Sequence, residues 1–218
     1  MLISHSKKFI TIDIPKTGTR SLRETLQPLK VIDLVGSPNP NADIYQHAKC
    51  REILKYCNKE EIDYKEYFFF SIVRNPWDRF FSHFYYLFKW KNKYETEDLS
   101  KWDSNEKSQG HQAKVLFDTH KKDEKILQVL TNVHGSQFDY LIDNNGKYMP
   151  DFCAKTESLQ KDFIKFCSHV NINPVPKIEH SNKNKREDYT YKDFYKKQMK
   201  DIVFKKEEKI IELFNYNF

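Results

Sequence analysis

The chain has 218 residues, which is enough for one sizeable hydrophobic core and too few to promise two independent catalytic domains. Lys and Arg number 37 against 31 Asp and Glu, so the formal net charge of +6 fits either a solvated basic surface or a field that gathers an anionic ligand. The sequence has no basic arm, zinc-finger spacing or aromatic RNP-like strand, and we therefore expect no nucleic-acid partner.

The sequence also lacks the usual signs of a membrane segment or a metal site. It has no apolar run of signal-peptide length at the start, and no stretch approaches the roughly 18 apolar residues of a membrane helix. The four cysteines form no CxxC pair and have no histidine at zinc-ligand spacing; they are Cys50, Cys57, Cys153 and Cys167. We expect a cytoplasmic protein with reduced thiols, no membrane insertion and no metal.

The first part of the chain alternates predicted strands and helices. Residues 8–14 (KFITIDI) alternate and are β-branched, which predicts a strand, and PKTGTR then supplies a turn before a helix over residues 21–29. Residues 31–35 (VIDLV) predict a second, short strand. A helix is expected over residues 48–57.

The most apolar segment is residues 67–73 (YFFFSIV). Such a run is typical of a central parallel strand that is covered on both faces. It ends at Arg74. Asn75 can cap a helix and Pro76 suits its first turn, which predicts a helix over residues 77–89.

The remaining segments complete the pattern. Residues 91–112 are polar and rich in lysine, and we interpret them as a variable loop or a frayed helix. The other predicted elements are helices over residues 112–117, 122–130, 157–171 and 191–214 and a strand over residues 151–155. Strands that alternate with helices indicate an α/β fold, a single domain over residues 1–218 with a central, mostly parallel sheet flanked by helices.

A polar loop follows the first predicted strand. It comprises Pro15, Lys16, Thr17, Gly18, Thr19, Arg20 and Ser21. Between a strand and a helix, such a loop aims backbone N–H groups and the positive end of the helix at one point, which is how proteins bind phosphate. Gly18 lets the backbone approach an oxyanion, and Lys16 adds a point charge. A Walker A loop has its lysine after the glycines, so this loop is either a different anion cradle or an ordinary turn.

A second motif covers residues 71–82 (SIVRNPWDRFFS). Arg74 stands at the predicted end of the buried strand, where its planar guanidinium can bind a phosphate through two hydrogen bonds. Ser82 lies about two helical turns beyond Asn75 and can close on the same phosphate. The structural alternatives are an ion pair for Arg74 and a solvent-facing hydroxyl for Ser82.

The two motifs together carry a resemblance. PKTGTRSL resembles the 5′-phosphosulfate loop of sulfotransferases that use 3′-phosphoadenosine-5′-phosphosulfate (PAPS), and RNPWDRFFSHFYY resembles their 3′-phosphate motif. The resemblance implies a P-loop-like sulfotransferase fold, PAPS as co-substrate, 3′,5′-adenosine bisphosphate (PAP) as product, and no metal. It assigns Arg74 and Ser82 to the 3′-phosphate of PAPS. It assigns to the 5′ end Lys16, Thr17, Gly18, Thr19, Arg20 and Ser21.

The similarity is greatest to the carbohydrate-type branch, sulfotransferase family 2, and extends over nearly the whole chain. DFCAKTESL at residues 151–159 resembles the DFIGRxExL segment of that branch, and the ending FNYNF resembles its YxF. HSNK at residues 180–183 resembles an element that closes over the donor, which implies a donor contact for Lys183, although Asn184 departs from the usual Ser or Thr. Carbohydrate sulfation is implied, while a lipid headgroup or a small metabolite remains open as the acceptor. Residues 91–112 are candidates for facing it.

Transfer of a sulfuryl group to a hydroxyl needs a cation at the leaving phosphate and a base for the hydroxyl proton. Lys16 is the candidate cation. The resemblance implies that His47, in an HAxxxEI context, is the base, whereas a lone histidine is more often structural. Glu24, on the helix after the loop, is the alternative base.

Alternative interpretations remain for several residues and for the activity of the protein. The aromatic residues on the helix after Arg74 are more often core than a binding box at helical spacing. Arg79 either helps to bind the donor or pairs with a carboxylate such as Glu157. The alternatives to a sulfotransferase are a P-loop small-molecule kinase and a non-catalytic module that binds PAP or an anionic glycan.

Overall fold

A computed structural model of the protein describes residues 1–39, 42–179 and 190–218. The chain divides into two compact units. The first unit comprises Met1–Asn75 and Ser136–Glu187, and the second comprises Pro76–Gly135 and Asp188–Phe218. The interpretation of residues 1–218 as one domain stays a prediction.

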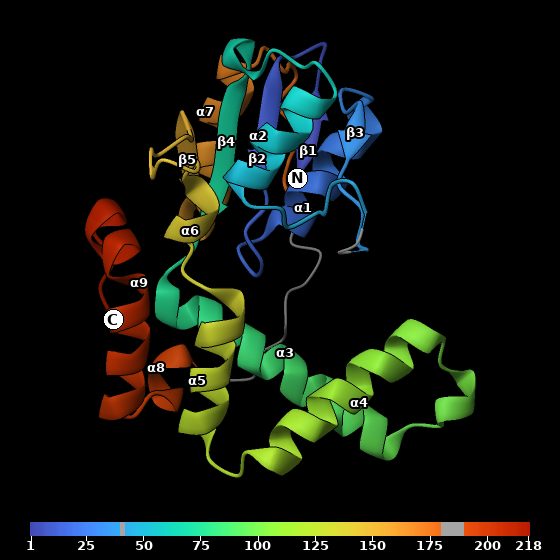
Figure 1. Ribbon diagram of the computed structural model, residues 1–218, viewed down its shortest axis with the longest axis vertical. Helices are drawn as coiled ribbons and strands as arrows, with labels where there is room; N and C mark the ends of the chain where they lie inside the picture. The colour runs from blue at the N-terminus through green and yellow to red at the C-terminus, as the bar shows by residue number, and fades with distance from the viewer. Residues whose placement is uncertain (40–41, 180–189) are drawn as a thin grey trace. The chain divides into compact units, whose positions relative to one another are not determined.

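The first unit is built on a five-stranded sheet with the order β3-β1-β2-β4-β5 (Figure 1). The strands are β1 Leu2–Ser4, β2 Phe9–Ile12, β3 Leu34–Val35, β4 Phe68–Val73 and β5 Phe152–Lys155. Strands β2, β4 and β5 are parallel, while β1 pairs antiparallel with both β2 and β3. The apolar run that predicted a central strand is β4, with β2 and β5 as its two neighbours.

Helices cover both faces of this sheet, which confirms the predicted α/β class. They are α1 Thr19–Leu26, α2 Cys50–Lys59, α6 Phe138–Leu141 and α7 Leu159–His169. Figure 1 shows α2 in front of the sheet and α7 behind it. Leu22 and Leu26 of α1 join Phe163 and Phe166 of α7 in one buried cluster that also contains Phe70 of β4. Burial of these side chains stabilises the packing of α1 and α7 against the sheet.

The second unit is helical. Its α-helices are α3 Pro76–Thr96, α4 Ser104–Thr119, α5 Asp123–His134, α8 Tyr191–Phe194 and α9 Lys197–Phe214. The other four helices each pack against α3. Trp77, Phe80, Phe81 and Phe84 of α3 are at most 9% exposed, so these aromatic residues form core, as their helical spacing favoured.

Three expectations need correction. The strand predicted over residues 31–35 is limited to Leu34–Val35, and the sequence patterns missed β1 and α6, which are three and four residues long. Residues 91–112, interpreted as a variable loop or a frayed helix, are mostly helical: they contain the end of α3, a 3-10 turn at Leu99–Lys101 and the first part of α4. A capping box between Asp103 and Glu106 starts α4, which explains how so polar a segment becomes helical.

Candidate functional site

The predicted anion loop connects β2 to α1 at the carboxyl end of β2. Gly18 precedes α1 with a φ of 93°, a left-handed conformation that favours glycine. Lys16 also has a positive φ, 69°, which is uncommon for a residue with a side chain and typical of functional loops. The buried Thr17 hydroxyl donates to the Ile14 carbonyl at 2.9 Å, so the loop is held from within.

The structure joins this loop to the second motif. The Arg74 guanidinium donates through Nη1 to the carbonyl of Lys16 at 3.1 Å. The Thr156 hydroxyl lies within 2.8 Å of the Thr17 carbonyl and 3.0 Å of the Val73 carbonyl. Because the carboxyl ends of parallel strands meet at one edge of a sheet, residues that follow β2, β4 and β5 share a single location, where α/β proteins bind ligands.

The backbone of Arg74 is fixed by one side chain. The amide of Gln137, which is fully buried, accepts a hydrogen bond from the Arg74 N–H at 3.0 Å and donates one to the Arg74 carbonyl at 2.9 Å. The next residue, Asn75, donates its N–H to Glu157 Oε1 at 2.6 Å. Arg74 therefore starts from a rigid backbone, which limits where its guanidinium can reach.

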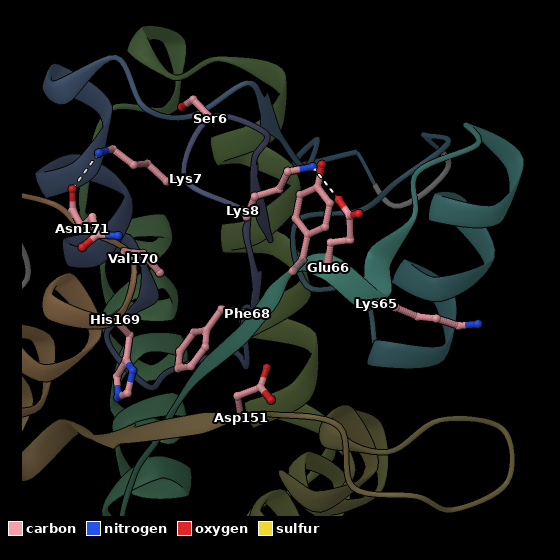
Figure 2. A pocket seen from close by; sticks show the side chains of 11 residues that line it. Ser6, Lys7, Lys8, Lys65, Glu66, Phe68, Asp151, His169, Val170 and Asn171 are labelled. Atoms are coloured by element: carbon pink, nitrogen blue, oxygen red, sulfur yellow. Dashed lines mark hydrogen bonds and ion pairs between the residues drawn. The ribbon is translucent and has the colours of Figure 1, made fainter.

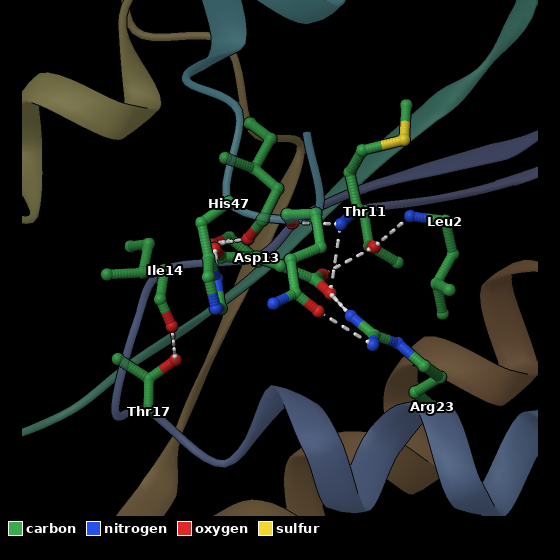
Figure 3. A network of polar contacts seen from close by, with 11 residues as sticks. Leu2, Thr11, Asp13, Ile14, Thr17, Arg23 and His47 are labelled. Carbon is green, nitrogen blue, oxygen red and sulfur yellow. Dashed lines mark hydrogen bonds and ion pairs between the residues drawn. The ribbon is translucent and has the colours of Figure 1, made fainter. Parts of the chain in front are cut away.

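His47 lies against the start of the same loop (Figure 3). Its Nδ1 is 2.8 Å from the carbonyl oxygen of Asp13. A carbonyl can only accept, so Nδ1 carries the proton and the neutral ring presents Nε2 as an acceptor. Burial lowers the pKa of His47 below its usual value, an effect that outweighs the opposing hydrogen bond from the ring to Asp13. A neutral imidazole at pH 7 is the form that a general base requires.

The remaining predicted residues are placed as follows. Thr19 and Ser21 are buried in the first turn of α1, whereas Arg20 is exposed and pairs with Glu24, the alternative base, at 2.7 Å. Ser82 is 5% exposed on α3 in the second unit, so it is not the solvent-facing hydroxyl of the structural alternative. Lys183 lies outside the described residues. Arg79 pairs with a carboxylate, that of Glu207, at 2.7 Å.

Four residues at this site were not predicted. Gln137 and Thr156 hold the backbone of Arg74 and the loop, and Asp13 and Arg23 lie beside His47. Thr156 had a usable signal, because it directly follows the strand predicted over residues 151–155. Asp13 directly follows β2 in the structure but fell inside the strand predicted over residues 8–14. Gln137 and Arg23 had none, since nothing local distinguishes them from other polar residues.

A separate cavity of about 590 Å³ lies at the opposite end of β4 (Figure 2). It is bordered by Phe68, the first residue of that strand, whereas Arg74 follows its last. Two of its three lysines are engaged locally, since Lys8 pairs with Glu66 at 3.0 Å and Lys7 donates to the Asn171 carbonyl at 2.6 Å. Of the predicted site residues that the structure describes, none borders this cavity.

Two further observations concern metals and membranes. Within residues 1–39, 42–179 and 190–218, no group of three or more His, Cys, Asp or Glu side chains is arranged to hold a metal ion. Of the helices in the described part of the chain, none combines the length and the apolar character needed to span a bilayer.

The loop that carries His47 depends on a glycine. A Cβ at Gly36 would lie 2.8 Å from the Cα of Gln46, the residue before His47. This distance is shorter than a Cβ tolerates from a backbone atom. We expect Gly36→Ala to lower the free energy of unfolding by about 1–3 kcal/mol, as overpacking against backbone does. Urea unfolding followed by circular dichroism measures this. As a control, Gly146→Asn should have little effect, since nothing lies within 4 Å there and asparagine tolerates a positive φ; equal losses in both variants would contradict the prediction.

The sheet order and the loop between β2 and α1 give this α/β protein the strand, loop and helix arrangement with which many proteins bind phosphate groups. The model of the sulfotransferase family matches residues 1–217, and the chain therefore belongs to the sulfotransferase family. Searches of curated proteins and of solved structures found no significant match. Family membership identifies the protein as a transferase of sulfuryl groups and favours this activity over the phosphoryl transfer of a kinase.

Proposed function

We propose that this protein transfers the sulfuryl group of PAPS to a hydroxyl of a carbohydrate or a small metabolite. The observation that carries the proposal is the 3.1 Å hydrogen bond from Arg74 Nη1 to the Lys16 carbonyl, which brings the two motifs into contact in the fold. Motifs that are 58 residues apart in the sequence thus border one location. PAPS carries phosphate at both its 3′ and its 5′ positions, and this arrangement suits such a ligand.

In this proposal the loop binds the 5′ end of the donor. Backbone N–H groups at the start of α1 and the hydroxyls of Thr19 and Ser21 surround the phosphosulfate, and Arg20 adds charge at the exposed side. Arg74 binds the 3′-phosphate through its planar guanidinium. The resemblance assigns Ser82 and Lys183 to the same phosphate.

The reaction is an in-line displacement at sulfur. The acceptor oxygen forms a bond to sulfur while the bond from sulfur to the 5′-phosphate oxygen breaks, and PAP leaves with that electron pair. The Lys16 ammonium stabilises the charge that grows on the leaving oxygen. The proton of the acceptor hydroxyl passes to His47 Nε2, which is available because Nδ1 donates to Asp13.

Calorimetric binding of PAP in the presence of EDTA tests the donor site. We expect micromolar affinity for the wild type and a loss of about 10- to 100-fold in each of the variants Arg74→Ala and Lys16→Ala, because hydrogen bonds to charged groups contribute about 1.5–3 kcal/mol each. Lys65→Ala is a matched control, because it removes one positive charge from the cavity at the opposite end of β4.

The binding and turnover experiments distinguish an incorrect donor site, a binding module and an active enzyme. If PAP does not bind, or if it binds equally well to all variants, the proposed donor site is wrong. If PAP binds as expected but PAPS is not turned over in an acceptor screen with carbohydrates, lipid headgroups and small hydroxyl compounds, the protein is a binding module rather than an enzyme. Turnover that depends on one class of compound identifies the acceptor.

A further inference from the structure

A network of charged groups lies behind the proposed catalytic base (Figure 3). The carboxylate of Asp13 is fully buried and accepts three contacts: from the Thr11 hydroxyl at 2.7 Å, from Arg23 Nη2 at 3.3 Å and from the Met1 amino group at 3.1 Å. Removing a carboxylate from water is costly unless such partners replace the water. The three contacts therefore hold Asp13 in one position.

Arg23 of α1 connects this carboxylate to the segment that carries the histidine. While Nη2 contacts Asp13, its Nη1 donates to the side-chain oxygen of Gln46 at 3.0 Å. Gln46 directly precedes His47, and Asp13 supplies the carbonyl that accepts from the ring. One guanidinium thus bridges the residue next to His47 and the residue to which His47 is hydrogen-bonded.

We propose that Asp13 and Arg23 are positioning residues for His47: they fix the carbonyl that selects its tautomer and the loop that sets its ring orientation, so that Nε2 faces the acceptor hydroxyl. This inference rests on the proposed function of His47 as base. Neither residue takes part in proton transfer itself. They act on His47 by fixing the position of its ring and by changing its pKa through their charges.

The charges of the two residues have opposite effects on the ring. The charged groups around His47 are the Asp13 carboxylate at the end of β2, the Arg23 guanidinium on α1 and the Met1 amino group at β1, and the Tyr45 ring packs edge-on at 5.6 Å. The carboxylate raises the pKa of His47, while the two cations lower it. Loss of Asp13 should therefore lower this pKa, and loss of Arg23 should raise it.

The test is NMR of the protein labelled with ¹⁵N in its histidines, over a pH titration, for the wild type and the variants Asp13→Asn, Arg23→Gln and their combination. We expect the Nδ1–H tautomer in the wild type, a mixed tautomer in each single variant, and shifts of the His47 pKa by about 1 pH unit, downward for Asp13→Asn and upward for Arg23→Gln. The double variant, which removes one charge of each sign, should return close to the wild-type pKa. Lys55→Gln, which removes a positive charge from the exposed face of α2, should leave the titration unchanged.

PAP binding measured on the same samples separates this inference from the proposed function. Unchanged PAP affinity with the opposite pKa shifts supports the positioning role. Identical tautomer and pKa in all folded variants would overturn it, even if PAP still binds. If Asp13→Asn does not fold, the direction of the His47 pKa shift in Arg23→Gln still decides between the two outcomes. Failure of PAP binding in the wild type would instead overturn the donor site and leave the NMR result intact.

Discussion

Replacement of Glu207 by methionine is expected to lower the free energy of unfolding by about 3–5 kcal/mol, because it removes the carboxylate partner of a buried guanidinium. Arg79 Nη1 lies 2.7 Å from Glu207 Oε1, and the two side chains are 2% and 0% exposed. The same nitrogen donates to the Gly135 carbonyl at 3.3 Å, so α3, α9 and the end of α5 meet at this group. Since a domain of this kind is stable by only about 5–15 kcal/mol, the loss should be obvious in urea unfolding.

Two control variants identify the cause of this loss of stability. Lys93→Gln breaks an ion pair on the same helix whose side chains are 57% and 46% exposed, and it should change stability little. The double variant Arg79→Met with Glu207→Met should recover most of the loss, because apolar side chains of similar volume replace both charges. A double variant as unstable as the single one would mean that packing, rather than the unpaired charge, sets the cost.

Replacement of His47 by glutamine should slow acceptor-dependent formation of PAP about 100- to 10,000-fold, the usual contribution of a general base. Glutamine keeps much of the shape of the ring and cannot take up a proton at neutral pH. The affinity for PAP should stay within about twofold of the wild type, since the ring is hydrogen-bonded to Asp13 and is not one of the residues proposed to bind phosphate. Release of PAP from PAPS with an acceptor from the screen measures the rate.

Glu24→Gln is the matched comparison for this experiment. Its carboxylate is 44% exposed and paired with Arg20, whereas the ring of His47 is held against the loop. If Glu24→Gln lost more activity than His47→Gln, Glu24 would be the base and His47 a structural residue. A loss confined to His47→Gln assigns the proton transfer to the imidazole.

The parts of the fold that sequence patterns predicted are those with local causes. The strand β4 is apolar along almost its whole length, and the turn at Gly18 needs a residue that adopts a positive φ, so both leave a signal within a few residues. The helical parts of residues 91–112 left a weaker signal. Their stability comes from contacts such as the ion pair of Lys91 with Glu95 and the packing of Trp90 on Trp102, which an apolar pattern does not reveal.

The site was predicted only in part, because several of its contacts join distant segments. The carbonyl of Asp13 meets a ring 34 residues away, and the Thr156 hydroxyl meets a carbonyl 139 residues away. Which distant residues meet depends on the strand order, which local patterns leave open. Strand β1 has only three residues, yet it lies between β2 and β3 and brings Met1 to Asp13.

The hydrogen-bonded pair of Arg74 and Gln137 has a consequence for how such proteins diversify. The helical stretch Pro76–Gly135 begins two residues after Arg74 and ends two residues before Gln137, so the Gln137 side chain joins the residues that flank it. The entropic cost of closing a loop rises only slowly with its length. Helices beyond Ser82 can therefore be lengthened, shortened or exchanged within this stretch without moving the backbone of Arg74, which lets one sheet carry different helical parts.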